Sequence, residues 1–519
     1  MKKEYDYVIV GSGFGGSVSA LRLAEKGYSV LVIEKGKRFE AKDFPKTNLN
    51  LKKWLWLPSM RFFGIFKLTF FKHVGIVSGV GVGGGSLVYA NTLPVPQKAF
   101  FNSGSWAGLA DWQNELEPFY RTAEKMLGAA RVPIPGPADE ALKEVAIKIG
   151  KEDEYAATNV SVFFGEPDKM VKDPYFSGKG PDRAGCNYCG ACMTGCRYNA
   201  KNTLDKNYLY LAEQLGVDIM PEKEVFDVLP NDPEGKTGYV IHYKSATKTH
   251  KKKDKVKAKN IIFAGGVLGT VSLLLKLKEG SLPNLSERLG FDIRTNNESL
   301  IGVINDKNDK DFSKGVAIGS ILHTDENSHL EVVRYGKGSS FWRLSFIPLA
   351  YGHTFGKRMK ALFKNYFSKP WRYTKIALQW NFTTKNTILL FMQTLDSTIR
   401  FKRGGTGMVS TIQEGEKPTS FIPEAKKLAE VYGKVTDGES FILSTETILG
   451  IPTTAHILGG CVIGENAEKG VIDKNQKVFG YQNMMVVDGS AISANPGVNP
   501  SLSITAMSER AMSMVADKE

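Results

Sequence analysis

Cysteine is scarce in this sequence, and so are long uninterrupted hydrophobic runs. Five cysteines among 519 residues are too few for a disulfide scaffold. The first residues carry charges of both signs and no apolar core, so no secretory signal is predicted. The longest uncharged stretch, residues 74–97, could span a membrane by length, but six glycines and two prolines mark it as a loop. We expect a cytoplasmic chain without a membrane span.

Acidic residues are missing from two segments. Residues 51–75 hold five Lys/Arg and residues 341–380 hold eight, with no Asp or Glu in either, and together these account for nearly all of the net charge of +14. No nucleic-acid-binding signature accompanies them, so we expect no nucleic-acid partner. Basic residues interleaved with aromatic ones suit an anionic membrane surface, which predicts a peripheral contact at the inner face of the membrane. The alternative is two solvated, partly packed segments.

The N-terminus has the pattern of a nucleotide site. An apolar run, Tyr5–Val10, predicts a buried parallel strand, and a helical pattern over Ser17–Lys26 precedes a second strand, Ser29–Ile33. Between the first strand and the helix stands GSGFGG, which places Gly11, Gly13 and Gly16 in a G-x-G-x-x-G motif. These glycines permit a tight turn, close approach of a pyrophosphate and helix–strand packing, respectively. Glu34 can accept hydrogen bonds from a ribose, which favours FAD or NAD over NADP.

Three later segments favour FAD. Residues 78–91 (SGVGVGGGSLVYAN) would let the backbone lie flat against a large planar or phosphorylated ligand. Residues 261–278 repeat the strand–loop–helix unit. Near the C-terminus, a strand ending at Asp488 precedes a helix that starts at Pro500, and this helix N-terminus would stabilise an anionic flavin ring.

These motifs together carry a family resemblance over the whole chain. The G-x-G-x-x-G turn, the GVGVGGGS loop at Gly79–Ser86, the AGGVLGT strand at Ala264–Thr270 and the tail H-x-L-G-G-C…VVDGS…G-V-N-P occur in the order found in glucose–methanol–choline (GMC) flavin oxidoreductases. The tail is most similar to that of bacterial cholesterol-oxidase-type members. The resemblance implies an α/β fold, with a Rossmann-type FAD-binding domain and an α+β substrate domain built on an antiparallel sheet. It also implies covalent or non-covalent FAD, an alcohol substrate and hydride transfer to the flavin.

The predicted FAD-binding residues come from all of these motifs. They are Gly11, Gly13, Phe14, Gly15, Gly16, Glu34, Gly79, Gly83, Gly84, Gly85, Ser86, Asn91, Val225, Ala264, Gly265, Asp488, Gly489, Asn499 and Pro500.

Three residues are predicted to be catalytic. The resemblance places the family's active-site histidine on His456 and its active-site asparagine on Asn499. Histidine suits the base that removes the hydroxyl proton, since its pKa lies near working pH. Glu331 lies in an apolar stretch and resembles an active-site glutamate of cholesterol-oxidase-type members; burial would raise its pKa and make it an alternative base. The non-catalytic alternatives are a structural His456, Asn499 as a helix cap and Glu331 as a surface partner of Arg334.

Four of the five cysteines fall within eleven residues: Cys186, Cys189, Cys192 and Cys196. Their C-x2-C-x2-C-x3-C spacing matches the bacterial ferredoxin run for an iron–sulfur cluster, although Arg197 stands where that run has proline. The alternatives are zinc, which usually takes two more widely separated cysteine pairs, and no metal. A cluster would pass electrons to an external acceptor and make the protein a dehydrogenase rather than an oxidase that uses oxygen.

We expect a discontinuous FAD-binding domain over residues 1–300 and 450–519, with a basic aromatic insert at 51–75 and a cysteine loop at 183–203. Residues 301–449 would form the substrate domain, with antiparallel strands at 317–322, 330–334 and 387–393. The basic segment 247–260 is predicted to be a solvated turn.

The predicted reaction is oxidation of a lipophilic alcohol, such as a sterol, an isoprenoid or a long-chain alcohol drawn from a membrane. Aromatic residues of the two basic segments would line its route inward: Trp54, Trp56, Phe62, Phe63, Phe66, Trp342, Phe363, Phe367 and Trp371. The alternatives are a small polyol or sugar dehydrogenase, a flavin and iron–sulfur protein for electron transfer or redox sensing, and a photodecarboxylase of the same fold.

Overall fold

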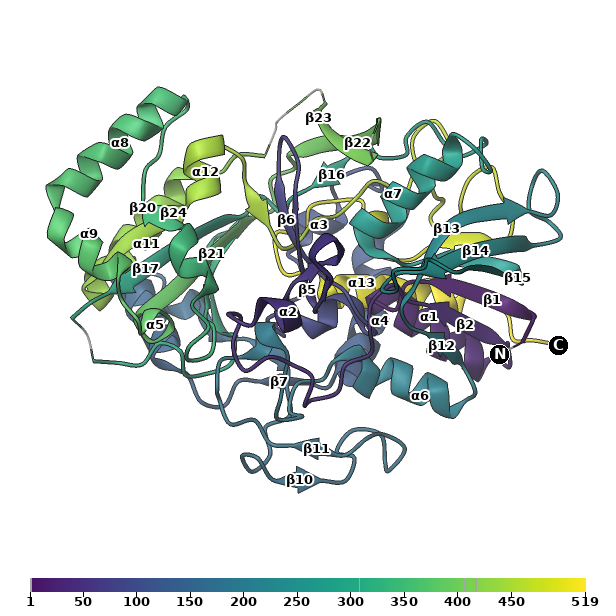
Figure 1. Cartoon of the computed structure of the whole chain (residues 1–519), viewed down its shortest axis with the longest axis horizontal. Coiled ribbons are helices and arrows are strands. Elements are labelled where there is room, and N and C mark those ends of the chain that lie inside the picture. The colour runs from purple at the N-terminus through teal and green to yellow at the C-terminus, as the bar shows by residue number, and fades with distance from the viewer. Residues whose placement is uncertain (1, 308, 406, 414, 416–417) are drawn as a thin grey trace.

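The computed structural model describes residues 2–307, 309–405, 407–413, 415 and 418–519. A seven-stranded, largely parallel sheet forms the first half of the molecule (Figure 1). Its strand order is β12 (Asp218–Met220), β2 (Val30–Ile33), β1 (Glu4–Val10), β15 (Lys253–Phe263), β14 (Tyr239–Ser245) and β13 (Lys223–Pro230), with β26 (Met484–Val486) also paired with β15. The strands β12, β2, β1, β15 and β26 run parallel, whereas β13 and β14 are antiparallel.

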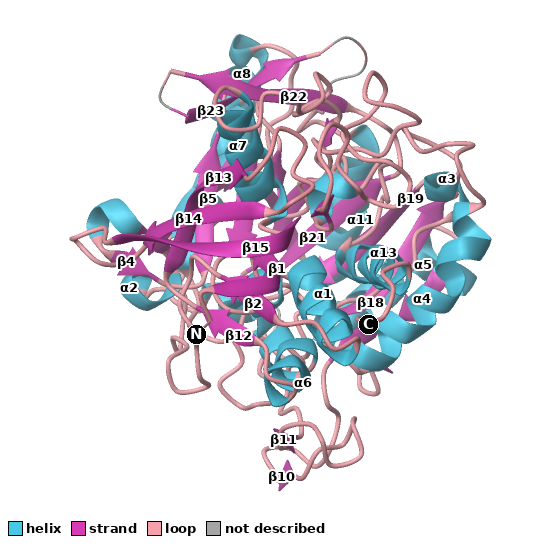
Figure 2. Ribbon diagram, turned by 90° about the vertical axis from the view of Figure 1, so that its right-hand side faces the viewer, coloured by secondary structure: helices cyan, strands magenta, loops and turns pink. Residues whose placement is uncertain are grey.

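Helices cover this sheet because its central strands are buried and apolar. Val8 and Ile9 of β1 are fully buried, as are all four residues of β2. One group of helices consists of α1 (Phe14–Glu25), α4 (Trp112–Leu127), α6 (Tyr208–Gln214) and α13 (Ser501–Ser513). Within it, α1 packs against α6 and α13, and α13 packs against α4 (Figure 2). The helix α7 (Gly266–Lys278) lies apart from this group, against β13 and the hairpin of β22 (Thr398–Gly404) and β23 (Gly407–Ile412).

The second large sheet is antiparallel throughout. Its order is β20 (Phe346–Pro348), β24 (Gly438–Leu443), β17 (Ser299–Asn305), β21 (Asn386–Gln393), β19 (Ser328–Val333), β18 (Ile318–Asp325) and β8 (Tyr155–Ala157). The helices α5 (Pro137–Lys148) and α11 (Pro423–Thr436) pack on one face, over Leu330, Val332 and Leu389. The opposite face presents Val333, Ile388 and Leu390, which belong to a separate apolar cluster. Because side chains alternate along the strands, one face of the sheet is covered by α5 and α11 and the other is turned toward the rest of the molecule.

Shorter elements complete the chain. The remaining helices are α2 (Leu51–Trp54), α3 (Lys98–Phe101), α8 (Phe355–Ser368), α9 (Pro370–Ala377), α10 (Phe382–Lys385) and α12 (Ser444–Leu449). The remaining strands are β3 (Trp56–Leu57), β4 (Phe62–Phe63), β5 (Phe66–Phe70), β6 (Gly75–Gly79), β7 (Ala129–Arg131), β9 (Asn159–Ser161), β10 (Met170–Val171), β11 (Arg183–Ala184), β16 (Ile293–Arg294) and β25 (Thr453–Thr454). The helices α8 and α9 lie at one end of the molecule, and the β10–β11 hairpin lies at its edge (Figure 1).

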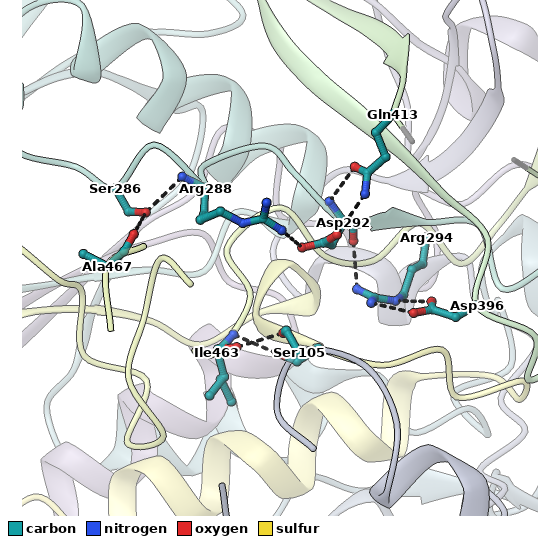
Figure 3. Close-up of polar contacts among 10 residues, drawn as sticks. Ser105, Ser286, Arg288, Asp292, Arg294, Asp396, Gln413, Ile463 and Ala467 are labelled. Atoms are coloured by element: carbon teal, nitrogen blue, oxygen red, sulfur yellow. Dashed lines mark hydrogen bonds and ion pairs between the residues drawn. The ribbon is translucent and has the colours of Figure 1, made fainter. Parts of the chain in front are cut away.

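Polar contacts fasten the segment that leads from α7 into the antiparallel sheet (Figure 3). Arg294, only 2% exposed, donates two hydrogen bonds to Asp396, at 2.6 and 2.9 Å. Arg288 pairs with Asp292, whose carboxylate also accepts from the side chain of Gln413. A solvent-exposed linker would not need these partly buried charge-assisted bonds, so the two sheets are joined by a fixed segment.

The α/β fold with a Rossmann-type domain and an antiparallel second sheet is confirmed. The prediction of a solvated turn over 247–260 is wrong for its second half, because Lys253–Asn260 belongs to β15. In that strand Val256 and Ala258 are buried while the lysines point outward, an alternation that the lysine-rich composition obscured. The domain boundaries at 300 and 450 stay a prediction, and β8 joins the antiparallel sheet from outside 301–449. Among the described helices, none has the length and hydropathy needed to cross a membrane.

Candidate active site

The glycine motif forms the tight turn between β1 and α1. Gly11 has a φ of +104°, and a Cβ atom there would lie 2.4 Å from the carbonyl oxygen of Ala264. A Cβ on Gly15 would lie 1.6 Å from the carbonyl oxygen of Val487, and one on Gly16 would lie 2.1 Å from that of Gly11. Gly13 differs, since its nearest neighbour would be 4.0 Å away. The turn is therefore packed on the protein side and open at Gly13.

That open side faces one large cavity of about 680 Å³, which runs between the two sheets. Its lining includes most of the predicted FAD-binding residues: Gly11, Gly13, Phe14, Gly15, Glu34, Gly79, Gly84, Gly85, Val225, Ala264, Gly265, Asp488, Gly489, Asn499 and Pro500. Its other walls come from the free face of the antiparallel sheet and its surroundings, with Leu300, Ile318, Val333, Tyr335, Trp342, Phe346, Ile388, Leu390 and Leu443. One end is thus glycine-rich, and the other is apolar.

Four predicted FAD-binding residues do not line the cavity. Gly16 packs against Gly11. Ser86 donates to the carbonyl of Gly83 at 2.7 Å and accepts from the backbone of Leu204, so this pair shapes the loop from behind. Asn91 is fully buried, and neither polar atom of its amide has a hydrogen-bond partner among the described residues. Sequence motifs do not distinguish residues that touch a ligand from residues that hold the loop around it.

The cavity has the features that a dinucleotide requires. The Glu34 carboxylate, held by the backbone of Ser12 at 3.1 Å and of Gly36 at 2.7 Å, lines it at the end of β2. The N-termini of α1 and α13 both reach its wall and supply positive potential. The glycine-lined wall leaves room for a flat ligand. The residues present therefore fit FAD.

His456 lies at the cavity wall and is held by a buried carboxylate. Its Nδ1 is 2.5 Å from Oε1 of Glu298, which is 2% exposed. Glu298 also accepts from the hydroxyl of Thr454 at 3.1 Å and from the backbone of Ala455 at 3.0 Å. Burial by itself would lower the pKa of the His456 imidazole, but the Glu298 carboxylate outweighs burial and raises that pKa above its ordinary value.

Asn499 connects His456 with Glu331. With its amide nitrogen toward the carboxylate, Asn499 donates to Oε1 of Glu331 at 2.8 Å and to Oε2 at 3.2 Å. The amide also lies 3.5 Å from Nε2 of His456. Glu331 is fully buried on β19, with Nε2 of His329 at 3.6 Å, and it does not itself line the cavity. The structure therefore brings all three predicted catalytic residues together.

Two of the non-catalytic alternatives are wrong. Glu331 is not a surface partner of Arg334, because Arg334 pairs with Asp139 at 2.7 Å. Asn499 does not cap α13. The N-cap residue of this helix is Pro500, and no side chain caps the helix by a hydrogen bond. Glu298 was not among the site residues predicted from the sequence. Since Glu298 and His456 are 158 residues apart, no local pattern links them.

The four cysteines of this loop are free thiols, and none of them forms a disulfide. Among the described residues, no three His, Cys, Asp or Glu side chains are placed to hold a metal ion. The metal content of this loop stays a prediction.

The aromatic residues of the two basic segments divide into separate roles. Trp54 and Trp56 are core residues, and Trp54 stacks on Phe66 with ring centroids 4.4 Å apart. Of the nine aromatic residues expected along the substrate route, only Phe66 and Trp342 line the cavity. Phe363, Phe367 and Trp371 are exposed on α8 and α9 instead. The expectation of one continuous aromatic route is wrong, because Trp54 and Trp56 are buried away from the cavity, whereas the exposed side chains on α8 and α9 face solvent.

Comparison with known proteins identifies the family. Models of the GMC oxidoreductase family match residues 179–289 and 420–508, and an NAD(P)-binding Rossmann-like domain matches 9–43. A cholesterol oxidase of Acinetobacter baumannii is 44% identical, over 99% of this chain and 95% of that protein. A cholesterol oxidase of Mycobacterium tuberculosis is 43% identical, over 100% of this chain and 92% of that protein.

Two more distant proteins also match nearly the whole chain. A long-chain-alcohol oxidase of Arabidopsis thaliana is 24% identical, over 99% of this chain and 67% of that protein. The crystal structure of pyridoxine 4-oxidase from Mesorbium loti superposes with a TM-score of 0.63 at 14% identity, covering 98% of both chains, which establishes a common fold. This chain belongs to the GMC oxidoreductase family, and it is an FAD-dependent alcohol oxidase or dehydrogenase.

Proposed function

We propose that the protein oxidises a lipophilic alcohol of the sterol, isoprenoid or long-chain class. One observation carries this proposal: His456 and Asn499 lie on the wall of a single cavity that is glycine-rich at one end and apolar at the other. The names of the relatives, cholesterol oxidases and long-chain-alcohol oxidases, agree with such a substrate. Bound FAD supplies the hydride acceptor.

In this proposal, His456 removes the hydroxyl proton at Nε2. The Glu298 carboxylate accepts a hydrogen bond from the proton on Nδ1, so Nε2 is left unprotonated and faces the cavity. Asn499 contacts the substrate oxygen. Glu331 holds the Asn499 amide in place by accepting two hydrogen bonds from it. Glu331 is then a positioning residue, since it does not line the cavity; the alternative in which it is the base would need Asn499 to move aside. The apolar sheet face excludes water from the hydroxyl.

The pH dependence of kcat/KM is expected to report His456. Because the Glu298 carboxylate raises its pKa, the imidazole is protonated and inactive as a base below that pKa, and activity rises as pH increases through a value above 6.5. In Glu298→Gln the burial effect remains and the carboxylate is lost, so the acidic limb of the profile should move to lower pH. The same variant should lower kcat by about ten- to a hundredfold, because the His456 imidazole loses the carboxylate that orients it.

The control is Glu298→Asp, which keeps the charge and should keep the limb above 6.5. A limb that stays in place in Glu298→Gln, but moves or disappears in Glu331→Gln, would make Glu331 the base. Activity that falls rather than rises through the pKa would contradict the role of a neutral His456.

A direct test of the proposed function measures product formation. Holoprotein is incubated with cholesterol, a branched isoprenoid alcohol, a long-chain alcohol, glycerol and glucose, with air and an artificial one-electron acceptor both supplied. We expect a carbonyl product from at least one of the three lipophilic alcohols and none from glycerol or glucose. Turnover of the water-soluble alcohols alone would assign the protein to the polyol or sugar dehydrogenases.

We further propose that α8 and α9 contact an anionic membrane. Trp371 on α9 and Trp380, which follows α9, are 87% and 86% exposed. Phe363 and Phe367 are exposed on α8. Lys357, Lys360 and Lys364 are exposed on α8, whereas Arg358 is buried and donates to the carbonyl of Thr447 at 2.6 Å. Exposed aromatic side chains beside lysines favour the headgroup region of anionic lipid. Since α8 packs against β20, whose Phe346 lines the cavity, this contact would lie near the substrate end.

Replacing both Trp371 and Trp380 with serine is expected to weaken binding to anionic vesicles by at least about tenfold, because each indole buries a large apolar area. Co-sedimentation with vesicles measures this. Ile134→Ser, at an exposed position outside these helices, is the control. Equal binding to neutral and anionic vesicles, or no effect of the double variant, would contradict the membrane contact.

A further inference from the structure

A short segment before the antiparallel sheet, residues 294–298, lies beside the segment that carries His456. The backbone N–H of Arg294 donates to the carbonyl of Leu458 at 2.9 Å, and the N–H of Leu458 donates to the carbonyl of Arg294 at 3.0 Å. A threonine hydroxyl from the same segment donates to the carbonyl of Thr295, also at 3.0 Å. Residues 294–298 are therefore fixed to the histidine half of the active site.

Asn296 reaches from this segment to the other half of the site. Its side chain is fully buried, and its amide nitrogen donates to the backbone carbonyl of Val498 at 3.0 Å and to a methionine sulfur of β21, also at 3.0 Å. Val498 immediately precedes Asn499, and Glu298 lies two residues after Asn296. One side chain thus connects the residue that orients His456 with the residue that we assign to the substrate oxygen.

The backbone at Asn296 takes a conformation that few side chains tolerate. Its φ is +61° and that of Asn297 is +47°, so two successive residues lie in the left-handed region. Asparagine enters this region more readily than most residues, because its short amide can bond to nearby backbone. The Asn297 amide also reaches β21, where it donates to the side chain of Gln393 at 3.0 Å. Two strained residues directly before Glu298 point to a role in the active site.

The Asn296 amide is retained at a cost to stability. Its Oδ1 atom has no hydrogen-bond partner among the described residues, and a buried polar atom left unpaired destabilises the fold. An apolar side chain of similar size would avoid that cost but could not donate to the Val498 carbonyl. We propose that Asn296 is a positioning residue, whose amide holds Asn499 at a fixed distance from His456. This inference rests on the proposed function, in which both of those residues act on the alcohol.

Asn296→Gly separates the amide from the backbone, because glycine adopts the same positive φ but has no side chain to reach Val498. The variant should lower kcat for alcohol oxidation by about tenfold or more at unchanged flavin content, since a small misplacement of a reacting group is costly. In an Asn499→Ala background the same substitution should have no further effect, because it acts through Asn499. A merely structural role would instead lower kcat by the same factor in both backgrounds.

Hydrogen exchange of the holoprotein, measured by mass spectrometry, tests the contact without any alcohol. In Asn296→Gly, residues 495–500 should exchange at least about tenfold faster than in wild type, whereas residues 454–458 should keep the wild-type rate. Asn483→Gly is the matched control. Asn483 also has a positive φ, +57°, and its amide donates to the carbonyls of Gly235 and Lys236 at 3.3 and 3.0 Å, outside the cavity lining. This control should leave kcat and both exchange rates unchanged.

Three results would overturn the inference: unchanged exchange at residues 495–500 in Asn296→Gly, wild-type kcat in that variant, or an equal loss of kcat in the Asn499→Ala background. The proposed function is tested separately, by reduction of the wild-type flavin with lipophilic alcohols. If exchange rises as expected and no alcohol reduces that flavin, the proposed function fails, whereas the contact between Asn296 and the Asn499 segment stands.

Discussion

His456→Gln is expected to lower kcat for alcohol oxidation by about three orders of magnitude or more, with FAD still bound. A positioned general base contributes about 10²–10⁴-fold, and glutamine keeps the size and polarity of the side chain but cannot accept the proton. The substitution also removes the 2.5 Å contact of the imidazole with Glu298, which would then lie buried without that partner. Steady-state kinetics together with flavin content per chain measures the effect.

The matched control for this prediction is His250→Gln, at an exposed position in the turn before β15. It should leave kcat, KM and flavin content unchanged. If His456→Gln keeps kcat within tenfold of the wild type, His456 is structural and the proposed base lies elsewhere. A chain that still exchanges electrons with an external acceptor but never oxidises an alcohol would support the redox-relay alternative.

Gly15→Ala is expected to abolish stable FAD binding. The added Cβ would lie 1.6 Å from the carbonyl oxygen of Val487, a backbone atom that follows β26 and cannot swing away. Helix α1 must therefore shift from the sheet, which displaces the turn at Gly11–Gly13 and lowers the free energy of unfolding by about 3 kcal/mol or more. The measurements are flavin absorbance per chain and the thermal midpoint.

Gly356→Ala serves as the control for the glycine prediction. Gly356 lies in the first turn of α8, no atom would come within 4 Å of its Cβ, and alanine is the better helix former. Its flavin content should stay unchanged and its thermal midpoint should stay the same or rise slightly. Full flavin occupancy in Gly15→Ala would show that α1 can move without loss of the dinucleotide site.

The dinucleotide half of the fold was predictable because its signals are local. The strand over Glu4–Val10, the glycine turn and the acid at Glu34 lie within thirty-five residues, and the structure places them around one cavity. The strands near 318–325, 328–333 and 386–393 were also visible from alternation. The lysine-rich start of β15 was not, because lysines dominated a segment in which only Val256 and Ala258 point inward.

The active site was predictable only in part, since its partners come from distant segments. His456 and Asn499 lie in C-terminal motifs, but Glu298 joins them across 158 residues and carries no motif of its own. The basic residues of α8 show the same limit. Arg358 has the sequence context of its exposed neighbours Lys357 and Lys360, yet the fold buries it against the carbonyl of Thr447. Which side of a helix faces solvent depends on the element packed against it, here α12.

The central claim, that a lipophilic alcohol gives its hydride to the flavin of this protein, is tested most directly by mixing the holoprotein with alcohols in the absence of oxygen. Anaerobic conditions remove the question of the electron acceptor, and the visible absorbance of the flavin reports the transfer alone. We expect cholesterol or a long-chain alcohol in detergent to bleach the flavin in wild type, to bleach it far more slowly in His456→Gln, and glucose and glycerol to leave it oxidised. A flavin that stays oxidised with every lipophilic alcohol, or that only a sugar reduces, would contradict the account.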